Sequence, residues 1–153
     1  MSAICAIMLL DESLDGSALI QRLTATMIRR GPDAREHWSS GKASLGHCML
    51  RTTPESLRET QPTVSRDGHL AIVMDGRLDN LDELRRELNS DGSLPVGTPD
   101  AHYVLAGYQR WGRGVARRLL GDFAFVIWDA RARTLYCARD CRSEEHTSEL
   151  QSQ

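Results

Sequence analysis

Residues 121–129 read GDFAFVIWD, and residues 130–138 continue as ARARTLYCA. Residues 123–128 form an uninterrupted apolar run, which is typical of a strand covered on both faces. The polar stretch at residues 129–133 predicts a turn, and residues 134–138 predict a second strand. Two strands joined by so short a connection pair antiparallel. This hairpin is therefore the first indication of an antiparallel sheet.

The sequence on the N-terminal side of this hairpin predicts four more strands and three helices. Apolar residues recur at helical spacing over residues 17–29, and two further helices are predicted to begin near residues 80 and 98. Strands are predicted at residues 3–10, 35–39, 43–50 and 70–74, and the last of them is expected to end at Asp75 and Gly76. Because the helices do not alternate with every strand, the pattern favours a layered α+β fold over a doubly wound parallel sheet.

The sequence also predicts how two of the helices begin. Asn80 is expected to accept hydrogen bonds from the free backbone N–H groups of the second helix, with Glu83 completing a pair of the capping-box type. Thr98 is expected to be the N-cap of the third helix, with Pro99 in its first turn.

Length and composition are those of one soluble domain. The chain has 153 residues, of which 41% are hydrophobic and 26% charged, and its formal net charge is −2. No basic run suggests a nucleic-acid partner. The apolar run at residues 3–10 is shorter than the roughly 20 residues of a membrane span and lacks the flanks of a signal peptide. Cys137 and Cys141 do not have metal-ligand spacing, so free thiols and a cytoplasmic location are expected.

The last residues differ from the rest of the sequence. Residues 142–152 read RSEEHTSELQS, which resembles the translation of a sequencing-adapter oligonucleotide. We therefore expect residues 1–141 to be one domain that is incomplete at its C-terminus, and residues 142–153 to be read-through rather than native protein.

Seven short motifs resemble, in the same order, the class II glutamine amidotransferase domain of the asparagine synthetase family. The resemblance covers nearly all of residues 2–141. It implies an N-terminal-nucleophile fold, a four-layer αββα sandwich that is truncated here at the C-terminus. The motifs are RGPD at 30–33, LGH at 45–47, QP at 61–62, DGRLDN at 75–80, Asp100 with residues 108–112, GDFAFVIWD at 121–129 and ARD at 138–140.

The family's chemistry uses an N-terminal Cys that attacks the glutamine side-chain amide, with its own α-amine as the base. An Asn side chain and a Gly N–H stabilise the oxyanion, an Arg pairs with the substrate carboxylate, and an Asp holds its ammonium. By the resemblance, these five positions hold Ser2, Asp75, Gly76, Met49 and Asp100, so the nucleophile, the amide donor and the cation are replaced.

Three other residues near these positions are interpreted separately. Cys5 is expected to be a core residue and not a displaced nucleophile. Arg51 would share a strand face with Met49 if that strand continued, and could then partly replace the missing cation. His47 is interpreted as a strand histidine whose hydrogen bonds are satisfied.

The resemblance implies a non-catalytic domain in a carbon–nitrogen ligase related to asparagine synthetase. Its nearest counterparts would be β-lactam synthetases and lasso-peptide cyclases, whose substrates supply their own amine. The expected partner is a downstream ATP-pyrophosphatase domain of the same protein, which would use ATP and Mg²⁺; no cofactor is expected in this chain. One alternative is an active domain that hydrolyses glutamine and supplies ammonia for asparagine formation. Another is a module that binds an amino acid, such as glutamine, without chemistry.

Overall fold

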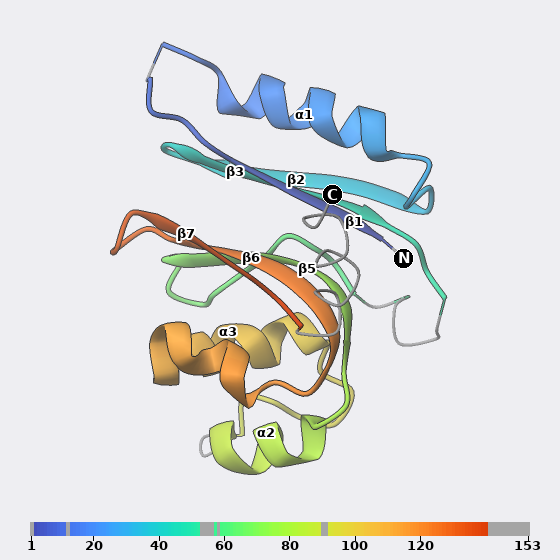
Figure 1. The fold of residues 1–153 in the computed structure, drawn as a ribbon, viewed down its shortest axis with the longest axis vertical. Coiled ribbons are helices and arrows are strands. Elements are labelled where there is room, and N and C mark those ends of the chain that lie inside the picture. The colour runs from blue at the N-terminus through green and yellow to red at the C-terminus, as the bar shows by residue number, and fades with distance from the viewer. Residues whose placement is uncertain (1, 12, 53–56, 58, 90–91, 141–153) are drawn as a thin grey trace, which may run out of the picture.

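The computed structural model describes residues 2–11, 13–52, 57, 59–89 and 92–140. Two antiparallel sheets lie face to face, with one helix outside the first sheet and two helices outside the second (Figure 1). The helices are α1 (Gly16–Met27), α2 (Leu81–Leu88) and α3 (Asp100–Trp111), and a 3₁₀ segment, η2, spans Gly112–Arg118. The predicted α+β sandwich with four layers is confirmed. The adapter-like residues 142–153 lie outside the described residues.

Each sheet is built from neighbouring antiparallel strands. The first has the order β1-β3-β2 and the second the order β4-β5-β6-β7, so β2 and β4 are edge strands. The strands are β1 (Ala3–Met8), β2 (Ala34–Ser40), β3 (Ala43–Met49), β4 (Thr63–Val64), β5 (Leu70–Leu78), β6 (Gly121–Asp129) and β7 (Thr134–Arg139). The short β4 is not among the strands predicted from the sequence.

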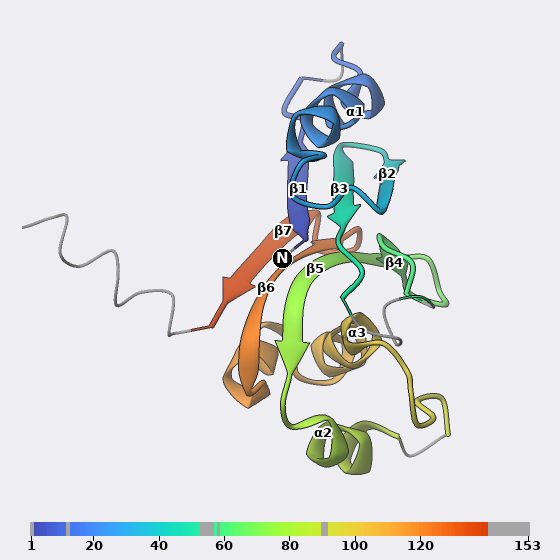
Figure 2. The ribbon, with the colours of Figure 1, turned by 90° about the vertical axis from the view of Figure 1, so that its right-hand side faces the viewer.

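Side chains on each strand alternate between two apolar layers, as the two-residue period of a strand requires. On β5, Ala71 and Val73 pack between the sheets against Leu45 of β3. Ile72 and Met74 belong to the larger cluster that joins the second sheet to α2 and α3. Because the sheets stack directly, residues at the start of β1 face residues of β5 across the inner layer (Figure 2).

The predicted end of β5 at Asp75 and Gly76 is wrong. β5 continues to Leu78, and Gly76 pairs with Phe123 of β6. Gly76 has a φ of 126°, and a Cβ there would overlap the carbonyl oxygen of Asp122. The glycine is thus needed for a close approach of two strands inside the sheet, where a side chain would not fit.

The predicted helix caps are only partly right. Asn80 is the N-cap of α2, but without the predicted cap hydrogen bond. Its side chain accepts from the Leu120 N–H at 3.0 Å and donates to the Arg118 carbonyl at 2.9 Å. Pro99, and not Thr98, is the N-cap of α3. The Asn80 side chain therefore joins α2 to the segment before β6 and does not bind the first N–H groups of its own helix.

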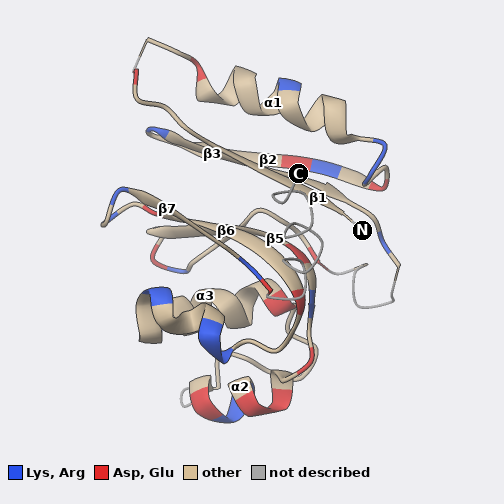
Figure 3. Ribbon diagram, in the orientation of Figure 1, with Lys and Arg blue, Asp and Glu red and all other residues tan. Residues whose placement is uncertain are grey.

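The two outer helical layers differ in charge (Figure 3). Arg22 is the one charged residue of α1, whereas α2 has the sequence LDELRREL with five. Within the described ranges, no helix is long and apolar enough to cross a membrane.

Candidate functional site

Ser2 lies at the start of β1, in the inner layer between the sheets. Its backbone N–H donates to Asp75 Oδ1 at 2.9 Å, and its Oγ accepts from the Leu50 N–H at 3.1 Å. Two residues predicted to belong to the site, Ser2 and Asp75, are therefore in direct contact. We call Ser2, Leu50, Asp75, Gly76 and Asp100 the N-terminal corner.

Asp75 reaches the corner because it lies on β5 in phase with Ala71 and Val73, which face the first sheet. Burial raises the pKa of the Asp75 carboxyl, and the hydrogen bond from the Ser2 N–H acts in the opposite direction. In its charged form, the carboxyl group has no proton to donate and acts only as a hydrogen-bond acceptor. Ionised Asp75 therefore offers an acceptor at the position that was predicted to correspond to the family's amide donor.

Asp100 is the first residue of α3, and it points back toward the end of β5. Its Oδ2 accepts from the Leu78 N–H at 2.7 Å. Burial raises the pKa of this carboxyl as well, with the Leu78 hydrogen bond opposing the shift. One oxygen of the predicted ammonium-binding group is thus already used to fix α3 against the sheet.

The end of β3 is held by the loop that contains the RGPD motif. The Asp33 N–H donates to the Met49 carbonyl at 3.0 Å, and Asp33 Oδ2 accepts from the Arg51 N–H at 2.7 Å. A Cβ at Gly31 would overlap the Cys48 carbonyl, so only glycine permits this close approach. The motif that marked the family therefore sets where β3 ends, directly before Leu50.

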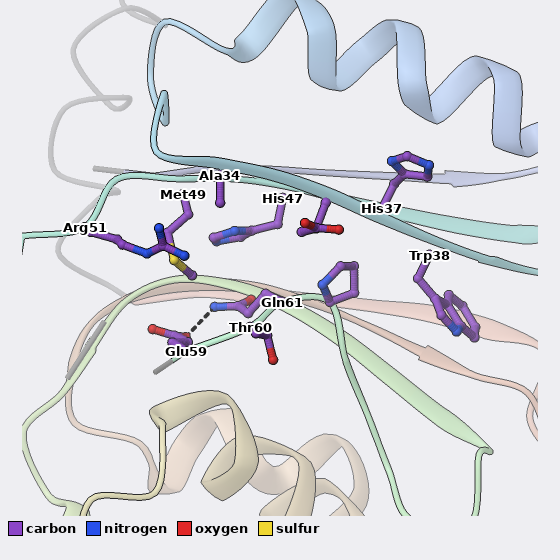
Figure 4. Close-up of a pocket in the computed structure, with 11 residues that line it drawn as sticks. Ala34, His37, Trp38, His47, Met49, Arg51, Glu59, Thr60 and Gln61 are labelled. Atoms are coloured by element: carbon purple, nitrogen blue, oxygen red, sulfur yellow. Dashed lines mark hydrogen bonds between the residues drawn. The ribbon is translucent and has the colours of Figure 1, made fainter. Parts of the chain in front are cut away.

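β3 ends at Met49, so the condition under which Arg51 was expected to share its strand face is not met. Met49 is nevertheless buried, and both side chains line one cavity (Figure 4). Arg51 is thus a cation beside Met49, the residue predicted to replace the family's Arg.

Cys5 lies on the other face of β1, toward α1. A Cβ built on Gly46 would meet both Cys5 Sγ and a Thr24 methyl, which places the sulfur under that helix. Burial raises the pKa of the Cys5 thiol to about 11. Cys5 is therefore a half-buried residue packed under α1, and its raised pKa keeps the thiol protonated at neutral pH.

Two residues beside the N-terminal corner, Gln61 and Glu59, were not predicted as site residues. Gln61 binds both backbone groups of Met74: Oε1 accepts from its N–H at 2.6 Å, and Nε2 donates to its carbonyl at 2.9 Å. Nε2 also donates to Glu59 Oε1 at 2.6 Å. Burial raises the pKa of Glu59, and the charges of Asp100 and Asp75 add to that increase. The pKa of Glu59 thus depends on both acidic residues of the corner, Asp75 and Asp100. The QP motif was the sequence signal that could have pointed to Gln61 and its partner Glu59.

A cavity of about 400 Å³ lies between the sheets at the edge formed by β2 and β4 (Figure 4). It is lined by Ala34, Glu36, His37, Trp38, His47, Met49, Arg51, Glu59, Thr60, Gln61 and Pro62. We call it the inter-sheet cavity. Its lining shares Met49 with the predicted glutamine site, but not Ser2, Asp75, Gly76 or Asp100.

His47 in this cavity differs from its predicted state. The side chain is only 2% exposed, and its Nε2 has no hydrogen-bond partner among the described residues. Burial lowers the pKa of His47 to about 4, opposed by an interaction with the Met74 carbonyl. The imidazole is therefore neutral at physiological pH, and one polar atom stays unpaired.

The described residues contain no group of three or more His, Cys, Asp or Glu side chains placed to hold a metal ion.

Comparisons with known proteins agree with this fold and place it in a family. Residues 1–144 match the model of the glutamine amidotransferase domain. Amidase chyE of Penicillium rubens is 39% identical over 111 residues, which is 72% of this chain and 16% of that protein. A putative glutamine-hydrolysing asparagine synthetase of Mycobacterium tuberculosis is 32% identical over 84% of this chain and 21% of its own length.

The glutamine phosphoribosylpyrophosphate amidotransferase of Bacillus subtilis, solved with ADP and GMP, superposes with a TM-score of 0.50 at 25% identity. The match covers 66% of this chain and 24% of that one. The chain spans about a fifth or less of the length of the curated relatives it matches. Taken together, the two stacked sheets, the order of the motifs and the family match show that this chain belongs to the glutamine amidotransferase domain family, in the group found in asparagine synthetase-like proteins.

Proposed function

We propose that this domain does not hydrolyse glutamine and acts as a structural part of an ATP-dependent amide-forming enzyme. The observation that carries the proposal is the Asp75 carboxylate, whose Oδ1 lies 2.9 Å from the Ser2 nitrogen. A negative charge beside the reacting centre opposes the oxyanion that amide hydrolysis must form. Losing even one oxyanion donor costs about 10²–10³ in rate.

The same carboxylate would also disable the base. If Met1 is removed, the nitrogen of Ser2 becomes a free α-amine, which would have to be neutral to accept the nucleophile's proton. A carboxylate within hydrogen-bonding distance favours the ammonium form instead. The Ser2 Oγ in addition accepts a hydrogen bond from Leu50 and is less nucleophilic than a thiolate.

Substrate recognition is weakened in the same direction. Met49 is buried and uncharged at the position where the family binds the glutamine carboxylate. Glu59, Asp75 and Asp100 add negative charge around the corner, which repels a carboxylate. These features together support a structural role over an active glutaminase.

The proposed partner is a following domain that activates a carboxylate with ATP and Mg²⁺ and joins it to an amine. The support is that the chain matches about a fifth or less of longer relatives, which include asparagine synthetases and an amidase. ATP and Mg²⁺ would belong to that domain. A cytoplasmic location is proposed with it, because ATP must be available there.

The test is release of glutamate from glutamine, measured for the wild-type chain and for Ser2→Ala. We expect both to give the same background rate, and mass spectrometry would report whether Met1 is removed. Turnover that depends on Ser2 would overturn the proposal and favour the ammonia-supplying function.

A further inference from the structure

We propose that the inter-sheet cavity is a binding site for a zwitterionic amino acid with an apolar side chain, separate from the N-terminal corner. This goes beyond the proposed function, because it requires neither glutamine nor a reaction. The argument rests on an unpaired buried nitrogen, on two opposite charges at one end of the cavity and on an aromatic ring at the opposite end.

The first observation is His47. Its Nε2 is buried, lacks a partner among the described residues and belongs to a side chain that lines the cavity (Figure 4). Buried polar atoms are nearly always hydrogen-bonded, so an unpaired one indicates that a ligand or an ordered water completes it. His47 comes from the middle of β3, where the ring cannot turn out to solvent.

The second observation is the pair of charges at one end of the cavity. Arg51 follows β3 on one sheet, and Glu59 precedes β4 on the other, so the two side chains approach the same end from opposite sides (Figure 4). They make no ion pair with each other in the described part of the chain. A guanidinium binds a carboxylate and a carboxylate binds an ammonium, the two groups that an amino acid carries on one carbon.

Gln61 fixes this end in place. Its side-chain amide binds the Met74 backbone with both of its polar atoms and also donates to Glu59. The carboxylate is therefore held at a fixed point of the cavity, because its hydrogen-bond donor is itself anchored to β5. Gln61 acts here as a positioning residue.

The opposite end of the cavity offers an aromatic ring against which an apolar side chain can pack, and Glu36, His37 and Thr60 also belong to the lining. Trp38 lies at the end away from Arg51 (Figure 4), and Pro62 also lines the cavity. His47 lies between the two ends, opposite Glu36 on the neighbouring strand. A volume of about 400 Å³ falls within the range of roughly 300–1,000 Å³ typical of small-molecule pockets.

The site can be reached because β2 and β4 are both edge strands. Glu36 on β2 is exposed at that edge and borders the entrance. Access to the cavity therefore requires no opening of either sheet.

The experiment is a calorimetric and thermal-shift titration of the 153-residue chain with L-phenylalanine. Two probes each lack one charge: 3-phenylpropionate has no ammonium, and 2-phenylethylamine has no carboxylate. We expect L-phenylalanine to bind, and both analogues to bind at least about tenfold more weakly because each leaves one charged group unpaired. Equal binding of either analogue, or no binding of L-phenylalanine, would overturn the proposal.

Variants locate the site. Arg51→Gln and Glu59→Gln should each weaken L-phenylalanine binding at least about tenfold, whereas Arg66→Gln, an exposed arginine before β5, should leave it unchanged. The ¹⁵N signal of the His47 ring should shift on binding. Unchanged affinity in both cavity variants, or an unmoved His47 signal, would refute the assignment. Ser2→Ala should bind normally, so failure of this inference is distinguishable from failure of the proposed function.

Discussion

The N-terminal corner and the inter-sheet cavity lie in the same layer between the sheets, yet they treat polar atoms in opposite ways. In the corner, the Ser2 N–H, the Ser2 hydroxyl and one oxygen of Asp100 all bind other groups of the chain. In the cavity, His47 Nε2 has no hydrogen-bond partner among the residues that the structure describes. The polar atoms of the corner are thus paired within the chain, whereas the cavity has a buried polar atom to which a ligand could bind. In this domain, a ligand site is therefore expected where buried polar atoms lack a hydrogen-bond partner, and the family's motifs do not mark that place.

The largest expected effect tests whether the backbone of the corner is rigid. Gly76→Ala should destabilise the chain by roughly 4 kcal/mol, from strain at its positive φ and from overlap with the Asp122 carbonyl. Chemical denaturation would measure this. Gly114→Ala, where a Cβ meets no atom within 4 Å, is the matched control. Similar losses in both variants would mean that the strand pairing at Gly76 is not tight.

The next effect tests the cavity through pH. The pKa of His47 is lowered from 6.5 to about 4 in the folded state. As the pH falls, His47 therefore takes up a proton in the unfolded chain before it does so in the folded chain. The stability that depends on neutral His47 is fully present above pH 6.5 and is lost by about pH 4. This loss is up to about 3 kcal/mol. His47→Gln should flatten the denaturation profile between these values, whereas His37→Gln, which is exposed, should not. A slope that His47→Gln leaves unchanged would contradict the buried neutral state.

A smaller effect tests Gln61, which lines the cavity and binds the backbone of β5 near the corner. Gln61→Ala removes both side-chain partners of the Met74 backbone and should cost about 2 kcal/mol, because buried backbone groups lose their hydrogen bonds. Gln21→Ala, whose amide contacts only exposed His37, should change stability by less than about 0.5 kcal/mol. Equal unfolding midpoints for these two variants would show that Gln61 does not anchor β5.

The smallest effect concerns the carboxylate of the corner itself. Because burial raises the pKa of Asp75, ionised Asp75 is less stable in the folded chain than in the unfolded chain. Asp75→Asn keeps an acceptor for the Ser2 N–H and should raise stability at pH 7, by less than about 1 kcal/mol because the group is only half-buried. The gain should vanish as the pH falls below the unfolded value near 3.8. A marked loss of stability at pH 7 would mean that the charge itself holds the corner together.

The sequence was sufficient to predict the layers but not the details of the corner. Apolar runs such as residues 123–128 predicted a layered α+β fold, because burial patterns follow from local periodicity. The αββα sandwich was implied by the resemblance that the ordered motifs carry. The continuation of β5 through Gly76 could not be read locally, since it depends on β6, more than 40 residues later in the chain. Asn80 failed as a cap for a similar reason: the backbone at Arg118 and Leu120, distant in sequence, competes for its side chain.

The residues of the site divide in the same way. The contact of Ser2 with Asp75 agrees with their predicted neighbourhood, but neither the comparisons nor the fold tests the roles assigned to Ser2, Met49, Asp75, Gly76 and Asp100, which remain predictions. Glu59 could not be identified in advance, because its importance arises from Gln61 and from two carboxyl groups on other elements. The unpaired state of His47 is likewise a property of packing that no sequence pattern carries.

The side chain of Gln61 has a consequence for self-association as well. β4 pairs with β5 only opposite Ala71 and Ile72, so the outer edge of β5 would present the backbone of Met74 as a template for another strand. The Gln61 side-chain amide binds both the N–H and the carbonyl of Met74, as one residue of a neighbouring strand would do. It thereby protects this edge against aggregation, a role that natural sheets more often give to charged side chains, prolines or bulges.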